Sequence, residues 1–398
     1  MNLFRSADIK KLFLIGTSII SAKSVLLLIA YFFDELTYNR FNQAYYTASL
    51  LMLFGGLGFN IAITRVSLRK VFLVAAVIVN IIIAYTLLNI FVESINTTAE
   101  TLSLMIYSIF AVLGSIYVFQ LLFSGSYFRF VTLTLTYSFL HLLIIPMINI
   151  YDVNLYILLP LISATWFFIG LPFYLKISKS VSASLFNFYK IGFSAFIINS
   201  SIPLALVLDK FIVNRFFDIE IANAYTFAWG LTAPLFYIGN IVEKLLYSEK
   251  KGDDYHLLKK GFFINIPLVV LYSLLALSMV NLFPSLLPGS VNASQFLIIF
   301  PLMISGYTAY VIFHFPVNAY LFKVAETEKH KLVAFSFLIV TAVIFICCFV
   351  ALNTIVVINF KSLLVMIWFY IFTLLIVKSY LLFKEDLGIG VQVSPVKK

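Results

Sequence analysis

Charged residues are scarce in this sequence. They make up 11% of its 398 residues, whereas 62% are hydrophobic. Soluble domains carry about 25% charged residues, so a soluble globular chain is excluded. The apolar runs reach the roughly 20 residues that a helix needs to cross a bilayer, and they exceed the segments of about 10 residues that build membrane barrels. We therefore predict an all-α, multi-pass membrane protein whose first apolar run, from Leu12 to Phe33, is a retained span and not a cleaved signal peptide.

Residues for metal and redox chemistry are also few. Cys347 and Cys348 are adjacent within an apolar run, which argues against a structural disulfide. The four histidines are scattered, with no second ligand at helical spacing, so the sequence supports no metal site. A Gly-rich phosphate-binding loop is missing too, which argues against an ATP-driven pump. We predict no catalytic residues, no metal and no cofactor, and we expect a transporter rather than an enzyme.

The net charge of +10 does not indicate nucleic-acid binding, because the basic residues sit in short segments between apolar runs. Of the 27 lysines and arginines, 22 fall in one alternate set of these segments and four in the other, and Lys23 lies within a run. Positive residues collect on the cytoplasmic side of membrane proteins. We therefore expect both termini in the cytoplasm and no nucleic acid among the partners.

The apolar runs predict twelve spans, which leave little chain outside the membrane. The spans are 12–33, 42–66, 71–92, 101–123, 131–150, 155–175, 191–213, 222–246, 262–283, 295–321, 332–352 and 362–383. The longest cytoplasmic segments are 176–190 and 247–261, and the longest periplasmic one is about 284–294. The first of these divides the chain into an N-lobe at 1–180 and a C-lobe at 181–398, with six helices each.

A charged corner from Asp209 to Glu220 is predicted between the seventh and eighth spans, and its pattern recurs near the second span. The two sets with equal spacing are Asp34, Asn39, Arg40 and Phe41, and Asp209, Asn214, Arg215 and Phe216. A second similarity relates Asn42-Gln43-Ala44-Tyr45 to Ala222-Asn223-Ala224-Tyr225. These similarities indicate an internal repeat in which the first span is equivalent to the seventh and the second to the eighth.

Ionisable residues within spans usually face a cavity or a partner. Lys23 lies about 11 residues into its span, roughly 17 Å deep, which is near the midplane. Arg65, Asp209 and Lys210 lie at span ends, so we expect them to reach headgroups or water, and we expect Arg65 and Asp209 to matter less than Lys23. His141 is also within a span, where a packing role and a proton relay are both open.

Helix-disrupting residues cluster in the second, seventh and eighth spans, which include Gly55, Gly56, Gly58, Pro203 and Pro234. Close helix packing is one explanation for them. A cavity lined by broken helices is the other.

The segment from Phe54 to Arg65, with the sequence FGGLGFNIAITR, resembles the second helix of bacterial O-antigen flippases. These form the polysaccharide-transport branch of the MATE-like multidrug/oligosaccharidyl-lipid/polysaccharide (MOP) exporter superfamily. Leu122 to Gly125, Ile144 to Pro146 and the stretch from Asp209 to Tyr225 are similar as well. The resemblance implies twelve transmembrane helices in two pseudo-symmetric six-helix lobes around a central cavity, lined mainly by helices 1, 2, 7 and 8.

The resemblance also implies a function. An undecaprenyl-diphosphate-linked O-antigen repeat unit would be flipped from the cytoplasmic to the periplasmic leaflet of the bacterial inner membrane by alternating access, in lipopolysaccharide biosynthesis. Membrane lipids, a polysaccharide polymerase and a chain-length regulator would be the other partners. The candidate substrate-binding residues are Lys23, Asn60, Arg65, Asn199, Asp209 and Lys210.

Three alternatives remain. A lipid II flippase would differ in substrate and not in architecture. A small-molecule exporter of the MATE type would need acidic residues in its cavity, and Asp209 near a span end is the one candidate. A surface-polysaccharide polymerase or ligase would need a large periplasmic loop, which the predicted segments do not provide.

Overall fold

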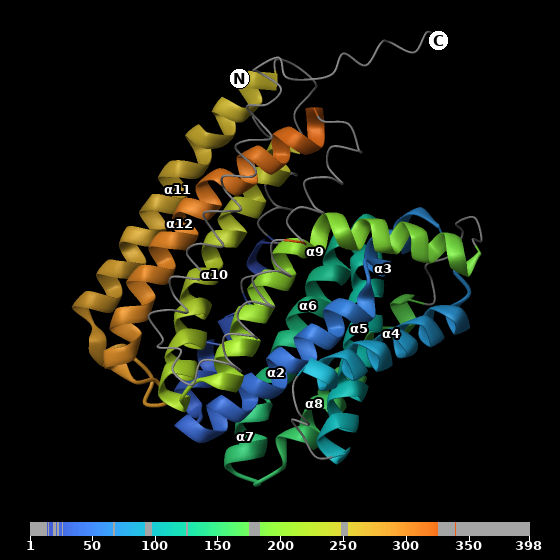
Figure 1. Ribbon diagram of the computed structural model, residues 1–398, viewed down its shortest axis with the longest axis horizontal. Helices are drawn as coiled ribbons and strands as arrows, with labels where there is room; N and C mark the ends of the chain where they lie inside the picture. The colour runs from blue at the N-terminus through green and yellow to red at the C-terminus, as the bar shows by residue number, and fades with distance from the viewer. Residues whose placement is uncertain are drawn as a thin grey trace.

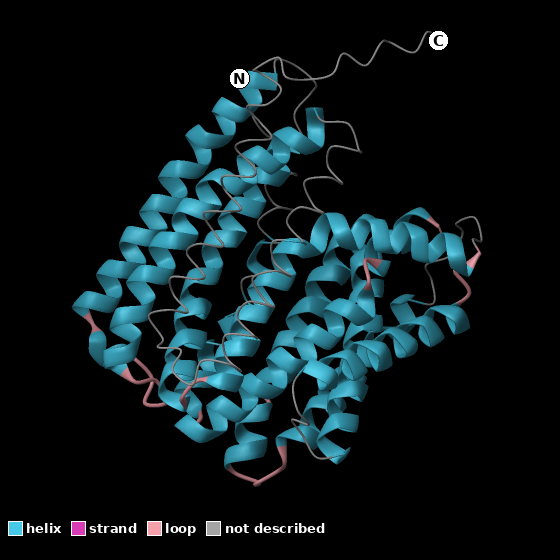
Figure 2. Ribbon diagram, viewed as in Figure 1, coloured by secondary structure: helices cyan, strands magenta, loops and turns pink. Residues whose placement is uncertain are grey.

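The computed structural model describes residues 27–66, 68–91, 98–124, 126–174, 184–247 and 254–324, with isolated positions in 14–25 and at 339. Its regular elements in these ranges are all helices (Figure 2). They are α2 (Glu35–Gly56), α3 (Phe59–Arg65), α4 (Lys70–Phe91), α5 (Thr98–Phe123), α6 (Tyr127–Leu142), α7 (Ile144–Asn149), α8 (Leu155–Tyr174), α9 (Leu185–Phe216), α10 (Ile219–Tyr247), α11 (Asp254–Leu282), the 3-10 turn η1 (Pro284–Leu286) and α12 (Ala293–Val324).

Six segments in this part of the chain are long and apolar enough to cross a membrane. They are Lys70–Asn89, Thr98–Leu121, Tyr127–Asn149, Leu155–Phe173, Leu258–Leu282 and Ala293–Val317. The protein is thus a multi-pass membrane protein. The predicted spans from 42–66 to 295–321 are confirmed as helical, whereas 332–352 and 362–383, together with Cys347 and Cys348, lie outside the described residues.

Two helices begin earlier than expected, which shortens the predicted cytoplasmic segments. α9 already begins at Leu185 and α11 at Asp254, so the segments 176–190 and 247–261 are partly helical. The side chain of Ser184 accepts a hydrogen bond from the backbone N–H of Asn187 at 3.3 Å and caps the start of α9. Such caps satisfy N–H groups that the first turn leaves without partners.

The second span is broken, which was one of the two explanations left open for its glycines. α2 ends at Gly56, and Leu57 and Gly58 then adopt left-handed backbone angles, with φ of 35° and 70°, before α3 begins at Phe59. Glycine adopts this conformation readily, whereas leucine does so only under strain. The break frees backbone groups near its start, and Asn80 Nδ2 of α4 donates to the Gly55 carbonyl at 3.3 Å. A neighbouring helix thus supplies the partner that a broken membrane helix requires.

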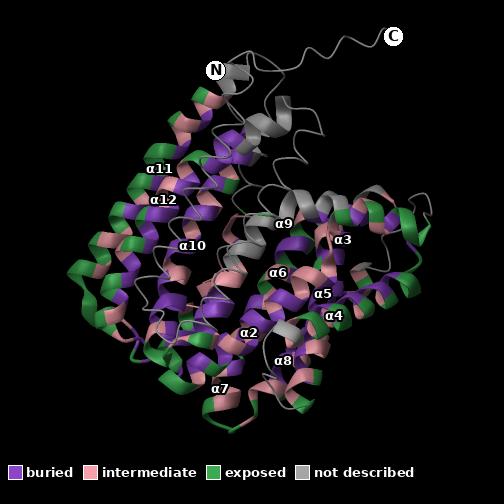
Figure 3. Ribbon diagram, viewed as in Figure 1, coloured by how far each residue is buried: buried purple, intermediate pink, exposed green. Residues whose placement is uncertain are grey.

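The helices form two groups that are joined by α9 (Figure 1). α2 packs against α4 and α5, and α10 packs in the same way against α11 and α12. α9 bends and contacts α3, α2 and α10, so it belongs to both groups. Figure 1 shows the groups close together at the end where α9 meets α10 and further apart toward the opposite end. Figure 3 shows exposed residues along the outer side of α11, where apolar side chains can contact lipid.

The main hydrophobic core crosses from one group to the other. Phe41 of α2 and Tyr107 of α5 share one cluster of buried side chains with Tyr225 of α10 and Phe300 of α12. A second cluster lies among α3, α4, α5, α6, α8 and the start of α9, and it includes Trp166 of α8. The core therefore holds the two groups together around α2, α9 and α10.

Asp34 caps α2, and the cap makes a pH-dependent contribution to stability. Its Oδ1 accepts from the backbone N–H of Thr37 at 2.8 Å and its Oδ2 from the Thr37 hydroxyl at 2.8 Å. The backbone hydrogen bond from Thr37 lowers the pKa of Asp34 below its usual 3.8. The cap therefore contributes fully above about pH 4, and its contribution is lost as the pH falls through the lower folded-state pKa.

We expect Asp34→Ala to lower the free energy of unfolding by about 0.5–2 kcal/mol at pH 6, because the first turn of α2 loses its cap. The difference from the native protein should shrink at pH 3. Unfolding curves in one detergent at both pH values check this, with Asp152→Asn as the exposed control. A difference that is equally large at pH 3 would contradict the role of the ionised carboxylate.

Candidate functional site

Asp209 and Lys210 lie within α9 and not in a loop. The predicted charged corner from Asp209 to Glu220 is shorter than expected, because α9 continues to Phe216 and only Phe217 and Asp218 form the turn. The continuation is favoured by apolar residues, and Asn214 Nδ2 donates to the Lys210 carbonyl one turn earlier at 2.9 Å. The two charges tolerate a helical interior because protein groups, rather than water, compensate them.

Lys210 is bound to its own neighbour in sequence. Its Nζ lies 2.8 Å from Asp209 Oδ1, and the side chains of Lys210 and Asp209 are 1% and 11% exposed. Consecutive residues on a helix point in different directions, so the lysine side chain must fold back to make this ion pair. The Nζ also lies 3.6 Å from the ring centroid of Trp229 on α10, which is a cation–π contact.

The second carboxylate oxygen of Asp209 is bound from two further helices. Its Oδ2 accepts from the Tyr225 hydroxyl of α10 at 2.8 Å and from the Tyr307 hydroxyl of α12 at 3.3 Å. Trp229 and Tyr307 are in edge contact at 5.2 Å. The expectation that Asp209 and Lys210 reach headgroups or water is therefore wrong, because both charges are compensated inside the protein.

Asp209 and Lys210 form a buried charge pair that is surrounded by aromatic side chains. Hydrogen bonds to ionised groups are about twice as strong as neutral ones, and a low local dielectric strengthens them further. An anion could compete with Asp209 for Lys210, and a cation or proton could compete with Lys210 for Asp209. Among the described residues, no three His, Cys, Asp or Glu side chains lie close enough to hold a metal ion.

The break in the second span places a second polar group beside α9. Asn60 lies half-buried in the first turn of α3, which packs against α9. Nearby, the hydroxyl of Tyr189 donates to Asn80 Oδ1 at 3.0 Å, while Asn80 binds the Gly55 carbonyl. Gly192 approaches the Leu57 carbonyl so closely that a Cβ there would lie 2.9 Å from the oxygen. α9 and the broken helix are thus in intimate contact.

The remaining candidates are placed only in part. Arg65 is the last residue of α3 and Asn199 lies in α9, but their side chains are outside the described part of the chain. Lys23 lies outside the described residues altogether. The structure therefore brings Asp209 and Lys210 together, puts Asn60 on a neighbouring helix, and leaves the role of Lys23 a prediction.

The similarity between Asp34 and Asp209 is not structural. Asp34 precedes α2, whereas Asp209 lies inside α9, eight residues before the start of the turn at Phe217. The second similarity fits better, because Tyr45 and Tyr225 both lie in the first half of their helices, α2 and α10. Tyr225 was part of that pattern, but nothing in the sequence assigned it to Asp209.

The polar residues of the two repeated patterns also form a junction between the two groups of helices, which the sequence did not predict. It consists of Asn39, Asn42 and Gln43 of α2, Asn214 of α9 and Asn223 of α10, which we call the carboxamide seam. The four asparagines are each less than 5% exposed. Gln43 Nε2 donates across the seam to the Asn214 carbonyl at 2.8 Å and within α2 to Asn39 Oδ1 at 2.9 Å.

Asn223 extends the seam to the connection before α12. Its Nδ2 donates to the Glu35 carbonyl of α2 at 2.9 Å and to the Ser290 carbonyl at 3.1 Å. The Ser290 hydroxyl in turn donates to the Ala30 carbonyl in the first span at 2.5 Å. These bonds join segments that lie up to 260 residues apart in the chain.

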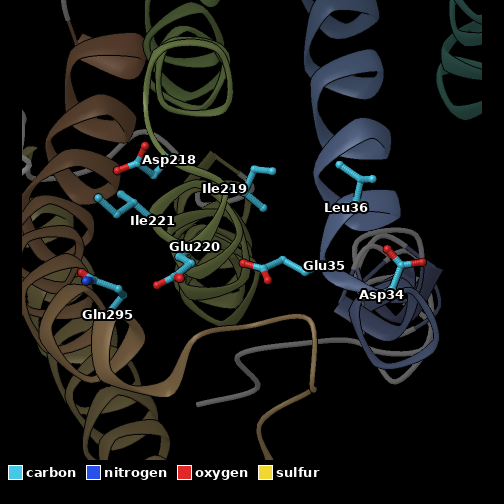
Figure 4. A pocket seen from close by; sticks show the side chains of 8 residues that line it. All are labelled: Asp34, Glu35, Leu36, Asp218, Ile219, Glu220, Ile221 and Gln295. Carbon is cyan, nitrogen blue, oxygen red and sulfur yellow. The ribbon is translucent and has the colours of Figure 1, made fainter.

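A surface pocket of about 740 Å³ lies beside the seam. Its lining residues are Asp34, Glu35, Leu36, Asp218, Ile219, Glu220, Ile221 and Gln295. Figure 4 shows the starts of α2 and α10 on opposite sides of this pocket, with Glu35 reaching toward Glu220. Asn292 Nδ2 donates to Glu220 Oε2 at 2.6 Å. The pocket is acidic and open to the surroundings, unlike the compensated pair of Asp209 and Lys210.

No protein-family model matches the sequence, and no curated protein matches it by sequence. Solved structures do match. An outward-facing multidrug resistance MATE family transporter of the MOP superfamily has a TM-score of 0.57 and 13% identity, with 97% of each chain covered. A MATE structure in the straight conformation has a TM-score of 0.55 and 13% identity, with 94% of this chain and 93% of that chain covered. The chain therefore has, over nearly its whole length, the fold of MATE transporters of the MOP superfamily.

Proposed function

We propose that the protein flips undecaprenyl-diphosphate-linked oligosaccharides, the repeat units of O-antigen or a related polysaccharide, across the bacterial inner membrane by alternating access. The observation that carries the proposal is Lys210, an ammonium only 1% exposed in the interior of a transporter fold. A diphosphate that enters a low-dielectric interior needs such a counter-charge. Lys210 is held by Asp209 and Trp229, so it is compensated when no substrate is bound.

The proposed direction is from the cytoplasmic to the periplasmic leaflet, with both termini in the cytoplasm. The distribution of lysine and arginine supports this orientation. It puts the turn at Phe217 and Asp218, and with it the carboxamide seam, on the periplasmic side. Moving two negative charges outward gains about 4 to 5 kcal/mol per 100 mV of membrane potential, at about 2.3 kcal/mol per charge.

The proposed architecture has two lobes of six helices, at 1–180 and 181–398. The packing supports a repeat, because α2 with α4 and α5 makes the same set of contacts as α10 with α11 and α12. In this arrangement α2 and α10 are equivalent helices. Inverted or parallel repeats of this kind place the substrate site between the two halves.

The proposed substrate site combines Lys23, Arg65 and Lys210 as cations with Asn60, Asn199 and Asp209. A polysaccharide polymerase and a chain-length regulator are the proposed downstream partners. Lys23 is the sharpest test, because an unpaired ammonium near the bilayer centre costs about 2.5 to 3.5 kcal/mol and needs a compensating function.

Lys23→Ala should abolish transport, whereas Lys23→Arg should retain part of it, because either cation can bind phosphate. The measurement is complementation of a strain that lacks its O-antigen flippase, read as the O-antigen ladder at the cell surface. Protein in the membrane fraction is quantified in parallel. A full ladder from Lys23→Ala would contradict the proposed role of Lys23.

Export of an organic cation is the second candidate, and a specific observation favours it. Asp209 with Tyr225, Tyr307 and Trp229 forms a carboxylate in an aromatic surrounding, which is a typical site for a cation. Vesicles that contain the purified protein separate the candidates. A fluorescent prenyl diphosphate should change leaflet if the protein is a flippase, whereas accumulation of ethidium without that change would favour the exporter. A lipid II flippase would show as transport of lipid II in the same vesicles.

A further inference from the structure

We propose that the carboxamide seam is a balanced latch, which sets how readily this end of the protein opens. The inference rests on the proposed alternating access, because it assumes that the two groups of helices separate here during transport. Figure 1 shows the groups close together at this end. The seam connects the elements that must then part, namely the first span and α2 on one side and α10 with the connection before α12 on the other.

Hydrogen bonds between the groups stabilise the closed arrangement. Asn223 of α10 donates to the Glu35 carbonyl of α2, and the Ser290 hydroxyl before α12 donates to the Ala30 carbonyl of the first span. Asn223 is fully buried and Ser290 is 2% exposed, so the donor side of each bond is shielded from water. Losing one of them while the groups stay together would leave a carbonyl buried without its partner, which is costly.

Unpaired amide atoms of the seam destabilise the closed arrangement. Asn39 Nδ2, Asn42 Nδ2, Asn214 Oδ1 and Asn223 Oδ1 are buried and have no hydrogen-bond partner. In the described part of the chain one further side chain has such an atom, Asn265 Oδ1. Buried polar atoms without partners are rare in folded proteins, and each one costs free energy until it is hydrated.

The two sets of atoms have opposite consequences for the same movement. Separation of the groups breaks the bonds from Asn223 to Glu35 and from Ser290 to Ala30, but it lets water reach the unpaired atoms. The loss and the gain oppose each other, and in the proposed latch they nearly cancel, so that the closed and open arrangements differ little in free energy. Such a near balance allows a substrate or a single residue to shift the populations.

The latch can be measured without any substrate. Spin labels are placed at Leu36 and Ile219, which are 47% and 38% exposed and line opposite sides of the surface pocket (Figure 4). The background is Cys347→Ala/Cys348→Ala, and the protein is held in lipid nanodiscs. Pulsed electron paramagnetic resonance then gives the ratio of long to short distances between the labels.

Removing the bonds should open this end. Asn223→Ala is expected to raise the ratio of long to short distances about tenfold, a change equivalent to about 1.4 kcal/mol. Ser290→Ala, which removes only the bond to Ala30, should act in the same direction with a smaller effect and serves if Asn223→Ala does not fold. Unchanged distances in the folded variants would overturn the proposal.

Removing an unpaired atom should have the opposite effect. The side chains of Asn42 and Tyr38 interact, so both residues are changed together in Tyr38→Phe/Asn42→Leu. This variant removes the unpaired Nδ2 and leaves no new polar atom buried, so the ratio of long to short distances should fall. A rise in this ratio would overturn the balance, because the seam would then act by its bonds alone.

Asn265→Ala is the matched control. Asn265 Nδ2 donates to the carbonyls of Val311 and Ile312, so it joins α11 to α12 within one group. Its loss should lower overall stability and leave the distance between the labels unchanged. A shift as large as that of Asn223→Ala would show that the labels report stability in general and would overturn the latch. O-antigen complementation is measured separately. If the distances change as predicted but O-antigen transport is absent, the result counts against the proposed substrate and not against the latch.

Discussion

Lys210→Met is expected to destabilise the protein by about 3–5 kcal/mol, because it removes one partner of a buried ion pair and leaves the other charge uncompensated. Asp209 would keep the hydroxyls of Tyr225 and Tyr307 but lose the ammonium at 2.8 Å. Thermal or denaturant unfolding of the purified protein in detergent, with its level in membranes, gives the measurement. Lys259→Met on the exposed surface of α11 is the control and should change little.

The double variant Asp209→Asn/Lys210→Met separates stability from transport. Replacing both charges removes the uncompensated carboxylate, so much of the lost stability should return. Transport should stay lost, because no cation remains at this position to meet the diphosphate. A double variant that transports normally would show that the pair is structural only. Lys210→Arg should keep part of both properties, since the guanidinium also pairs with carboxylates and aromatic rings.

Gly239→Val is expected to be the second most damaging change, with a loss of about 3 kcal/mol from overpacking. A Cβ at Gly239 would lie only 2.0 Å from Cδ2 of Phe315 and 2.7 Å from its Cγ. Phe315 is 4% exposed and is also packed against Phe236, so its ring has no space to move into. The helices α10 and α12 would have to separate, which also disturbs the bond from Tyr307 to Asp209.

Gly289→Ala is the matched control for this prediction, because no atom lies within 4 Å of a Cβ at that position. Its free energy of unfolding should change by no more than about 0.5 kcal/mol, which is the range of ordinary surface substitutions. Gly239→Ala should fall between the control and Gly239→Val. Equal midpoints for Gly239→Val and Gly289→Ala would mean that α10 and α12 adapt without cost, contrary to the close packing.

Composition and local pattern determined the class of this protein and most of its helices. The apolar runs are too long for the strands of a barrel, so helices that satisfy their own backbone were the stable form left to them in a bilayer. The glycines at 55, 56 and 58 left close packing and a broken helix both open, and the break at Leu57 is seen only in the structure. The resemblance of the segment from Phe54 to Arg65 pointed to the MATE-like fold that the solved structures share.

Only the tertiary structure decided what surrounds the charges. Asp209 and Lys210 were expected at a lipid interface because their depth along the span was the only information in the sequence. Their burial depends on Tyr225, Trp229 and Tyr307, which come from two other helices and up to 98 residues further along the chain. The carboxamide seam is decided in the same way, since Gln43 and Asn214 are 171 residues apart. Periodicity reports which face of a helix is polar, but the partner of each polar group is set by how the helices pack, and that determines whether a charge meets lipid, water or another side chain.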